Sequence, residues 1–290
     1  MGFVLGAVGA IFFAIASILF RLGQRTRPDD DGHLTSVVTN VVILGAIASV
    51  VDWSPWSWPG SVGLAAGGII GSVFGRYSLL RAIRLIGPTR SNAFITAAPL
   101  VTATLGWMIL GESLAPVEIV AGALVVTGLL GIVRTDRTME GPESRAPFTV
   151  YVVAAGIPMF FGSAFVVQRW ALAQFPGSMT GAFIGVVSAM FVVVVIDTFR
   201  GRLGSRIRGN ARAFPWHYVG AGALTSAGIM SQFRALELVE AWVVGLLQAT
   251  QVLWTMVLSV LVLGHEEHIT AGLIFNVLLI LLGVGGMIAA

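Results

Sequence analysis

The chain has 290 residues, of which 56% are hydrophobic and 11% are charged, and its mean hydropathy is +0.90. A soluble domain carries roughly a quarter charged residues, so this composition excludes an ordinary soluble protein and predicts an integral membrane protein. Because the chain contains no Cys, disulfides, thiol catalysis and Cys-ligated metals are excluded. The formal charge of +3 does not indicate a nucleic acid partner, since the Arg residues flank apolar segments.

Ten apolar runs follow one another along the chain, and crossing a bilayer as a helix takes about 20 residues. Five runs precede residue 137 and five follow residue 147; they span residues 3–20, 34–51, 60–80, 91–110, 117–133, 148–167, 177–196, 216–233, 241–263 and 269–289. Strand edges in lipid would leave backbone groups unpaired, so the runs should be helical. We predict an all-α integral membrane protein with ten transmembrane helices.

A polar segment separates the two sets of five runs. It contains Glu140, Pro142, Glu143 and Arg145, a composition typical of linkers. The sequence therefore predicts a first five-helix repeat at residues 1–136, a polar linker at 137–147 and a second five-helix repeat at 148–290.

The Arg residues are unevenly distributed between alternate connections. All 17 basic residues are Arg, and only Arg169 and Arg234 lie on the side opposite the rest. Since positively charged short loops remain in the cytoplasm, both termini are predicted to be external. The absence of Lys, with abundant Ala, Gly and Val, suggests a GC-rich bacterial genome, so we expect a multi-pass protein of the bacterial inner (plasma) membrane.

The two halves also share short sequence matches in the same order. Residues 12–21 and 160–169 both begin with Phe-Phe and end with Arg, and Arg-Ala-Ile at 81–83 matches Arg-Ala-Leu at 234–236. Each half has an odd number of predicted spans, so the second half enters the membrane from the opposite side. The halves are therefore predicted to be inverted repeats.

Several motifs accompany this layout. The first half reads Arg-Ala-Ile-Arg-Leu-Ile-Gly-Pro at 81–88, Ala-Ala-Pro-Leu at 97–100 and Leu-Gly-Glu-Ser-Leu at 110–114, followed by Gly122 and Gly128. With two five-span repeats, this pattern resembles the EamA-type transporters of the drug/metabolite transporter superfamily, in which a Pro-containing fourth helix ends in a Gly-Glu turn. The second half departs from the pattern, with Val252 in place of Pro99 and His265 before Glu266.

Carriers built from inverted repeats hold their substrate near the midplane, where helices are interrupted. Pro99 in the fourth run and Pro158 in the sixth can interrupt their helices or simply kink them for packing. Polar and aromatic side chains of the fourth and ninth runs are the candidate substrate ligands: Asn92, Thr96, Thr102, Trp107, Gln248, Gln251, Trp254 and Thr255. Interhelical hydrogen bonding is the alternative role for the polar members of this set.

Charged residues within apolar runs are few. Arg76 lies about one turn from the expected cytoplasmic end of the third run, so it is either a substrate ligand or a side chain that snorkels to the interface. Glu112 is expected to cap a helix. No Asp or Glu occupies the centre of a run, which counts against a proton-coupled drug antiporter.

The same runs hold no paired Asp and no Ser with His, so no catalytic residue is predicted and the chain is not expected to be an enzyme. No P-loop is present, and His265 to His268 are expected to form a solvated turn rather than a metal site, so neither a cofactor nor a metal is predicted.

We predict a secondary transporter of a small organic metabolite, such as an amino acid or related compound, working by alternating access. A divalent-cation transporter or channel and a non-transporting scaffold or sensor are the alternatives. The expected partners are the lipid bilayer and a small-molecule substrate, and a homodimer is left open.

Overall fold

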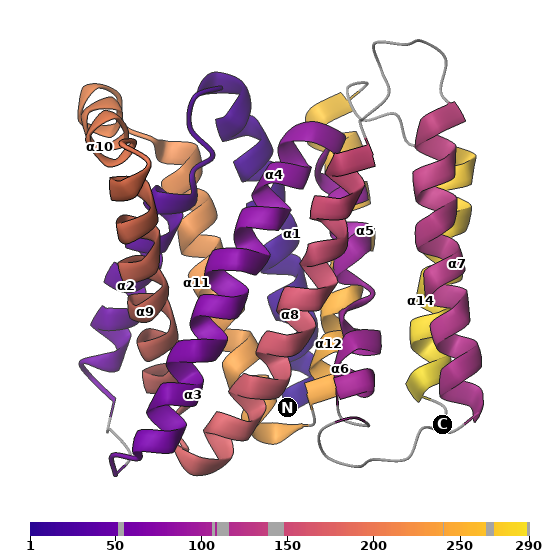
Figure 1. Ribbon diagram of the computed structural model, residues 1–290, viewed down its shortest axis with the longest axis horizontal. Coiled ribbons are helices and arrows are strands. Elements are labelled where there is room, and N and C mark those ends of the chain that lie inside the picture. The colour runs from indigo at the N-terminus through magenta and orange to yellow at the C-terminus, as the bar shows by residue number, and fades with distance from the viewer. Residues whose placement is uncertain are drawn as a thin grey trace.

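The computed structural model describes residues 1–51, 55–105, 108, 116–138, 148–239, 241–264 and 270–288. Within these residues the chain is helical and contains no strand, which confirms the all-α prediction (Figure 1). Five helical stretches are long and apolar enough to cross a membrane: Gly2–Thr26, Trp58–Ile86, Phe148–Gln174, Ser178–Phe199 and Ala241–Leu263. Shorter apolar helices accompany them, and the count of ten spans stays a prediction.

The first half forms helices in the predicted order. They are α1 (Gly2–Thr26), α2 (His33–Ala48), α3 (Trp58–Gly68), the π-helical segment η1 (Ile69–Gly75), α4 (Arg76–Ile86), α5 (Pro88–Ile95), α6 (Ala98–Leu105) and α7 (Pro116–Thr138). Helix α7 includes the first two residues of the predicted linker, and residues 139–147 lie outside the described residues.

The second half repeats this order with one addition. Its elements are α8 (Phe148–Gln174), α9 (Ser178–Phe199), α10 (Leu203–Arg212), α11 (Trp216–Leu238), α12 (Ala241–Ala249), α13 (Gln251–Leu258), the π-helical segment η3 (Ser259–Leu263) and α14 (Ala271–Ile288). The added helix, α10, has no buried residue and lies across one end of the bundle (Figure 1). The predicted turn at 265–268 and Glu112 are outside the described residues.

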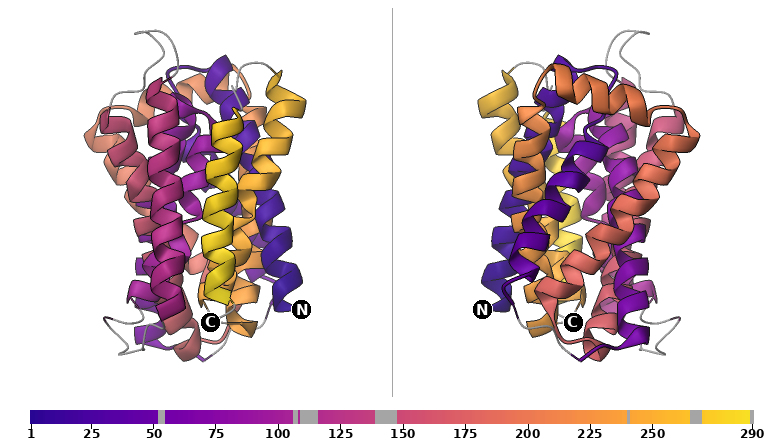
Figure 2. Two further views of the ribbon diagram at one scale, coloured as in Figure 1. Left: turned by 90° about the vertical axis from the view of Figure 1, so that its right-hand side faces the viewer. Right: turned by 90° about the vertical axis from the view of Figure 1, so that its left-hand side faces the viewer.

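The two ends of the bundle differ in composition. Both termini lie at one end, which we call the terminal end, and α10 lies at the other with the C-terminal ends of α1 and α4 (Figures 1 and 2). Because α10 and the ends of α1 and α4 carry Arg residues, we call the second end the Arg-rich end. The Arg asymmetry seen along the sequence thus becomes an asymmetry between the two ends of the folded bundle.

The third span is longer than its apolar run. The run was expected to end at Leu80, but α3, η1 and α4 continue to Ile86, and Gly87 then turns the chain with a φ of 82° before Pro88 starts α5. Arg81 and Arg84 end the apolar run without ending the helix. Arg76 therefore lies ten residues, or about 15 Å, before the end of the helix. The expectation of one turn was wrong.

Both the fourth and the ninth spans are broken near their centres. The break between α5 and α6 falls at Thr96 and Ala97, and the break between α12 and α13 falls at Thr250, a shift of 153 residues from Ala97. The ninth span breaks without a Pro, whereas Pro158 lies inside an uninterrupted α8. Helix α5 packs on α13 and α6 on α12, so the two broken spans run antiparallel.

Different apolar clusters pack the two ends. At the terminal end, Leu44, Leu64, Phe175 and Phe233 belong to a cluster that draws on α2, α3, α8, α9, α11 and α12. At the Arg-rich end, a smaller cluster joins α1, α4 and α11 through residues that include Phe20, Leu80 and Tyr218. Helices α7 and α14 pack along each other at one edge of the bundle (Figure 1). The space between these clusters is where the two halves enclose a cavity.

Candidate substrate site

A cavity lies in the middle of the bundle, with about 840 Å³ of empty space, part of it open to solvent. Both halves contribute to its wall through α1, α3, η1, α4 and α5 on one side and α8, α9, α11, α12 and α13 on the other. Phe13 and Phe161, which the repeat alignment pairs, both line it. Most of the wall is apolar or aromatic, and the polar lining residues are Ser17, Ser72, Arg76, Gln168, Thr225, Gln232, Gln248 and Gln251.

Among the described residues that line the cavity, Arg76 is the one that carries a charge. Its side chain is 7% exposed, and its Nη1 donates a hydrogen bond to Thr225 Oγ1 over 3.2 Å. Its Nε has no hydrogen-bond partner, and within the described chain Arg76 forms no ion pair. The snorkelling interpretation is wrong, because the side chain is buried at the cavity rather than directed to the interface. Arg76 directly follows η1, and π-helical segments occur often at functional sites.

Amide side chains supply most of the other polar groups. Gln232 Nε2 donates to Gln168 Oε1 over 3.2 Å and so joins α11 to α8. Gln248 is 2% exposed, and its Nε2 has no hydrogen-bond partner. Gln251 Nε2 donates to Asn92 Oδ1 over 2.7 Å, which joins α13 to α5. The wall thus combines amides that are satisfied within the protein with donors that are not.

The structure separates the predicted site residues into two groups. Arg76, Gln248 and Gln251 line the cavity, whereas Asn92 and Thr255 are buried between α5 and α13. Asn92 Nδ2 donates to Thr255 Oγ1 over 3.1 Å, and Thr255 Oγ1 donates to the carbonyl oxygen of Gln251 over 2.9 Å. For Asn92 and Thr255 the structure shows the interhelical hydrogen bonding that the sequence left open.

Thr96, Thr102 and Trp254 are not among the residues that line the cavity. Thr96 and Thr102 donate to backbone carbonyl oxygens, Thr96 to Ala93 and Thr102 to Ala98 over 3.0 Å. Trp254 is 45% exposed and does not line the cavity, and Trp107 lies outside the described residues. Sequence reasoning missed Gln168, Gln232 and Thr225; the available signal was that each is a polar residue in an otherwise apolar span.

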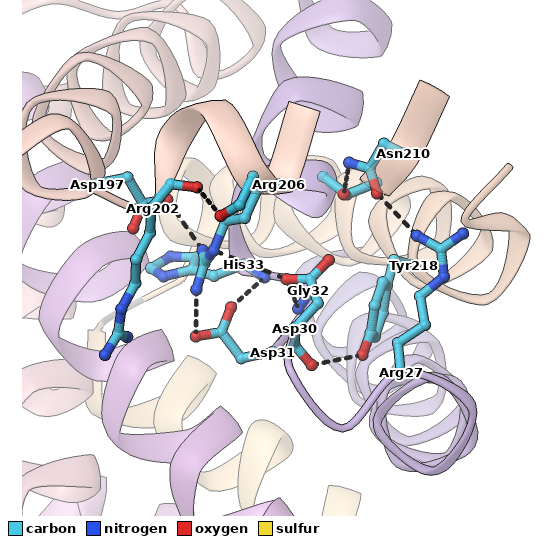
Figure 3. Close-up of polar contacts among 12 residues, drawn as sticks. Arg27, Asp30, Asp31, Gly32, His33, Asp197, Arg202, Arg206, Asn210 and Tyr218 are labelled. Atoms are coloured by element: carbon cyan, nitrogen blue, oxygen red, sulfur yellow. Dashed lines mark hydrogen bonds and ion pairs between the residues drawn. The ribbon is translucent and has the colours of Figure 1, made fainter. Parts of the chain in front are cut away.

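A polar cluster joins the halves at the Arg-rich end (Figure 3). Arg206 on α10 pairs with Asp197 Oδ2 over 2.9 Å, with Asp31 Oδ2 over 3.1 Å and with Asp30 Oδ1 over 3.9 Å. We call these four residues the Arg206 cluster. Burial alone would raise the pKa of Asp31, but the charges of Arg206 and His33 outweigh it and hold that pKa below its ordinary value. Asp31 is therefore charged at neutral pH, and the cluster is an ionic contact between the α1–α2 connection and the second half.

Further contacts connect this cluster to the cavity. His33 N donates to Asp31 Oδ1 over 3.0 Å, and the His33 ring nitrogen Nε2 lies 2.8 Å from the carbonyl oxygen of Ser72, a lining residue. Tyr218 donates to the carbonyl oxygen of Asp30 over 2.8 Å, and its ring packs 6.3 Å from that of Phe20, which also lines the cavity (Figure 3). The Arg206 cluster is therefore linked, through His33 and Tyr218, to two residues of the cavity wall, Ser72 and Phe20.

Comparisons with known proteins show which family the chain belongs to. No curated protein sequence matches the chain. Among the solved structures that match the chain, one crystal structure has a TM-score of 0.63 at 15% identity and covers 99% of this chain and 96% of that chain, a likeness that establishes the fold alone. The EamA-like transporter family, a family of membrane transporters in the drug/metabolite transporter superfamily, matches residues 1–134 and 148–289. The chain belongs to the EamA-like transporter family.

Proposed function

We propose that this protein is a secondary transporter of the plasma membrane that moves a small organic metabolite, such as an amino acid or a related compound, by alternating access. The central cavity is the observation that carries the proposal. It is lined by both halves and lies at the interrupted fourth and ninth spans, where inverted-repeat carriers hold their substrates. A few polar groups set in an apolar wall are also the usual composition of a small-molecule site.

Alternating access requires that the halves separate first at one end and then at the other. At the Arg-rich end they are joined by the ion pairs of Arg206 with Asp30 and Asp31. At the terminal end they meet through the apolar cluster that includes Leu64 and Phe233. Opening of the Arg-rich end would break the ion pairs, and opening of the terminal end would separate the apolar surfaces. Neither change needs a helix to unfold.

The alternative of a divalent-cation transporter fits the cavity less well. Hard cations bind carboxylate and carbonyl oxygens, and cation pores place acidic or carbonyl-rich rings along the path. Among the described residues that line the cavity there is no Asp or Glu, and the charged one is Arg76. A resident positive charge repels a divalent cation, so an organic substrate is the better fit. A scaffold or sensor would not require a polar cavity at all.

The test begins with the purified protein. Thermal stability is measured against pools of metabolites, since a ligand that binds only the folded state raises its apparent stability. Each stabilising compound is then tested for saturable exchange across liposomes that contain the protein. We expect at least one compound to exchange, and the absence of exchange for every stabilising compound would contradict the proposal.

Two matched Ser variants show whether exchange uses the cavity. Ser17 lines the cavity and Ser163 does not, yet each donates a hydrogen bond to the carbonyl oxygen four residues before it, over 2.9 and 2.7 Å. Ser17→Leu should fill part of the cavity and abolish exchange, while Ser163→Leu should leave exchange intact. Equal exchange rates in the two variants would show that the substrate takes another route.

A further inference from the structure

We propose that the cavity binds a monocarboxylate, a small organic acid with one carboxylate and an apolar body, and that Arg76 and Gln248 donate hydrogen bonds to its carboxylate. This proposal rests on the proposed transport function and narrows its substrate class, from amino acids and related compounds to the related compounds that carry a carboxylate and no ammonium group. It starts from two buried donors, Arg76 Nε and Gln248 Nε2, which have no hydrogen-bond partner among the described residues and belong to residues lining the same cavity.

Arg76 has more hydrogen-bond donors than the protein provides acceptors for. A guanidinium has five N–H donors in a rigid fork that matches the two oxygens of a carboxylate. Thr225 Oγ1 accepts from Nη1, and Nε is left without a partner although the side chain is 7% exposed. Burial of an unpaired cation is costly, because the charge gives up its hydration without gaining a counter-ion. An anionic ligand would supply the missing charge and the missing acceptors.

Gln248 adds a second, independent donor. Its side chain is 2% exposed, and its unpartnered atom is the amide nitrogen, which can only donate. Gln251, on the same span, instead donates to Asn92 and is satisfied within the protein. Both unsatisfied groups, Arg76 Nε and Gln248 Nε2, are thus hydrogen-bond donors, and a ligand with several acceptor oxygens would satisfy them.

The net charge of the cavity lining further restricts the class of substrate. Arg76 contributes one positive charge, and no described lining residue is Asp or Glu. A monocarboxylate would neutralise the site, whereas a zwitterion would leave its ammonium group without an anionic partner. Apart from its polar residues, the wall consists of Gly, aliphatic and aromatic residues and suits an apolar body; the aromatic ones are Phe13, Phe20, Phe161, Phe165 and Phe233. The site is therefore matched to an aliphatic or aromatic monocarboxylate.

The experiment uses purified full-length protein and four probes of similar size. Dissociation constants are measured by calorimetry at pH 7 for phenylacetate, its neutral amide phenylacetamide, the zwitterion phenylalanine and the cation 2-phenylethylammonium. Hydrogen bonds to charged groups contribute about 1.5 to 3 kcal/mol, so we expect phenylacetate to bind about 10-fold to 150-fold more tightly than the amide. Phenylalanine should bind more weakly than phenylacetate, and the cation should bind least.

Three Arg variants test the assignment through the ratio of the acid and amide constants, which a general loss of folding would not change selectively. Arg76→Gln should bring the ratio close to one. Arg76→Lys keeps the charge without the planar fork and should give an intermediate ratio. Arg81→Gln, on the exposed face of the same helix, is the matched control and should keep the full ratio. If Arg76→Gln does not fold, the Lys variant carries the comparison.

Each remaining outcome has a defined meaning. Equal affinity for acid and amide, a preference that survives both Arg76 variants, or tighter binding of phenylalanine than of phenylacetate would overturn the monocarboxylate proposal while leaving a transporter of another substrate. Hexanoate, an aliphatic monocarboxylate, is measured in the same way as a fifth probe, and failure of both phenylacetate and hexanoate to bind would overturn the proposal as well. If phenylacetate binds with the expected preference but never exchanges across liposomes, the site assignment stands and the proposed transport function is wrong.

Discussion

Arg169 on α8 donates a hydrogen bond to the carbonyl oxygen of Leu236, near the C-terminal end of α11. The first half contains the equivalent contact, in which Arg21 Nη1 donates to the carbonyl oxygens of Ile83 over 3.2 Å and Arg84 over 2.8 Å. The sequence alignment of the repeats pairs Arg21 with Arg169 and Ile83 with Leu236. The same contact, from an Arg side chain to the carbonyl oxygens near the end of a helix, therefore occurs once in each half, as expected for inverted repeats. It accounts for the presence of Arg169 on the side of the membrane where basic residues are otherwise scarce.

Loss of either Arg should destabilise the fold, because the last carbonyl oxygens of a helix have no partner within the helix. We expect Arg21→Ala and Arg169→Ala each to lower the free energy of unfolding by about 1 to 2 kcal/mol, after allowance for their partial exposure. Thermal inactivation of purified protein measures the effect. Arg208→Ala is the control, since Arg208 is exposed and donates to Gly204 within its own helix. A loss as large in the control would refute the capping role.

Removal of Arg206 should open the Arg-rich end. Its side chain is 9% exposed and pairs with three acids, so Arg206→Ala leaves their charges unbalanced. Since the chain has no Cys, a single Cys placed at the lining residue Ser72 reports access. We expect Arg206→Ala to increase labelling of Ser72→Cys by an impermeant thiol reagent added on that side. An unchanged labelling rate would show that the Arg206 cluster does not control access.

The pH dependence of the Arg206 cluster follows from Asp31. The pKa of Asp31 lies below its ordinary value of 3.8, so its stabilising contribution is present above that value and is lost as the pH falls through the lower, folded-state pKa. The stability difference between wild type and Asp31→Asn should therefore be constant from pH 8 to pH 5 and should shrink below about pH 4. Melting temperatures of both proteins across this range test the sign. A difference that already falls between pH 8 and pH 6 would assign the titration to another group.

Gln248 and Gln251 should respond differently to the same substitution. Gln251 donates to Asn92, so Gln251→Leu leaves a buried acceptor unpaired and should cost about 1 to 3 kcal/mol of stability. Gln248 Nε2 has no partner to leave unpaired, and Gln248→Leu should instead weaken ligand affinity with little loss of stability. A double-mutant cycle of Gln251 with Asn92 should show coupling, and a cycle of Gln248 with Asn92 should not. The opposite pattern would reverse the two roles.

The orientation in the membrane that the Arg distribution predicts can be tested by Cys labelling at two exposed positions. Gly204 lies on α10 at the Arg-rich end, and Ser49 follows α2 at the terminal end. In intact cells, an impermeant reagent should label Ser49→Cys from outside and reach Gly204→Cys only after permeabilisation. External labelling of Gly204→Cys with protection of Ser49→Cys would invert the assignment.

Hydropathy predicts the order of the helices because lipid imposes one strong constraint, the burial of backbone polar groups within helices. It does not predict where helices end, as Arg81 and Arg84 show by ending an apolar run inside a continuous helix. It also missed the break at Thr250, because the ninth span lacks the Pro that marks the fourth. On the same span, Gly245 of α12 lies close to Pro99 of the fourth span.

Some residues of the candidate site could be predicted from the sequence, and others could not. Arg76 stands out as a charged residue within an apolar run, and Gln248 as a polar residue at helical spacing from Gln251 and Thr255. Which face of a helix points inward depends on its neighbours, and this information separates Trp254, which is 45% exposed, from Gln251, which lines the cavity. Gln168 and Gln232 are also polar residues of apolar spans, but the hydrogen bond that joins them links two spans that no pattern along the chain relates.

Under the proposed alternating access, the different chemistry of the two ends predicts a dependence on temperature in one direction. Hydrophobic association weakens on cooling, so the apolar cluster around Leu64 and Phe233 loosens in the cold. The ion pairs of Arg206 have no comparable dependence on hydrophobic association, and their burial shields them from salt. Cooling should therefore shift the resting population toward opening at the terminal end, and the rate-limiting step of the transport cycle should change with the growth temperature of the cell.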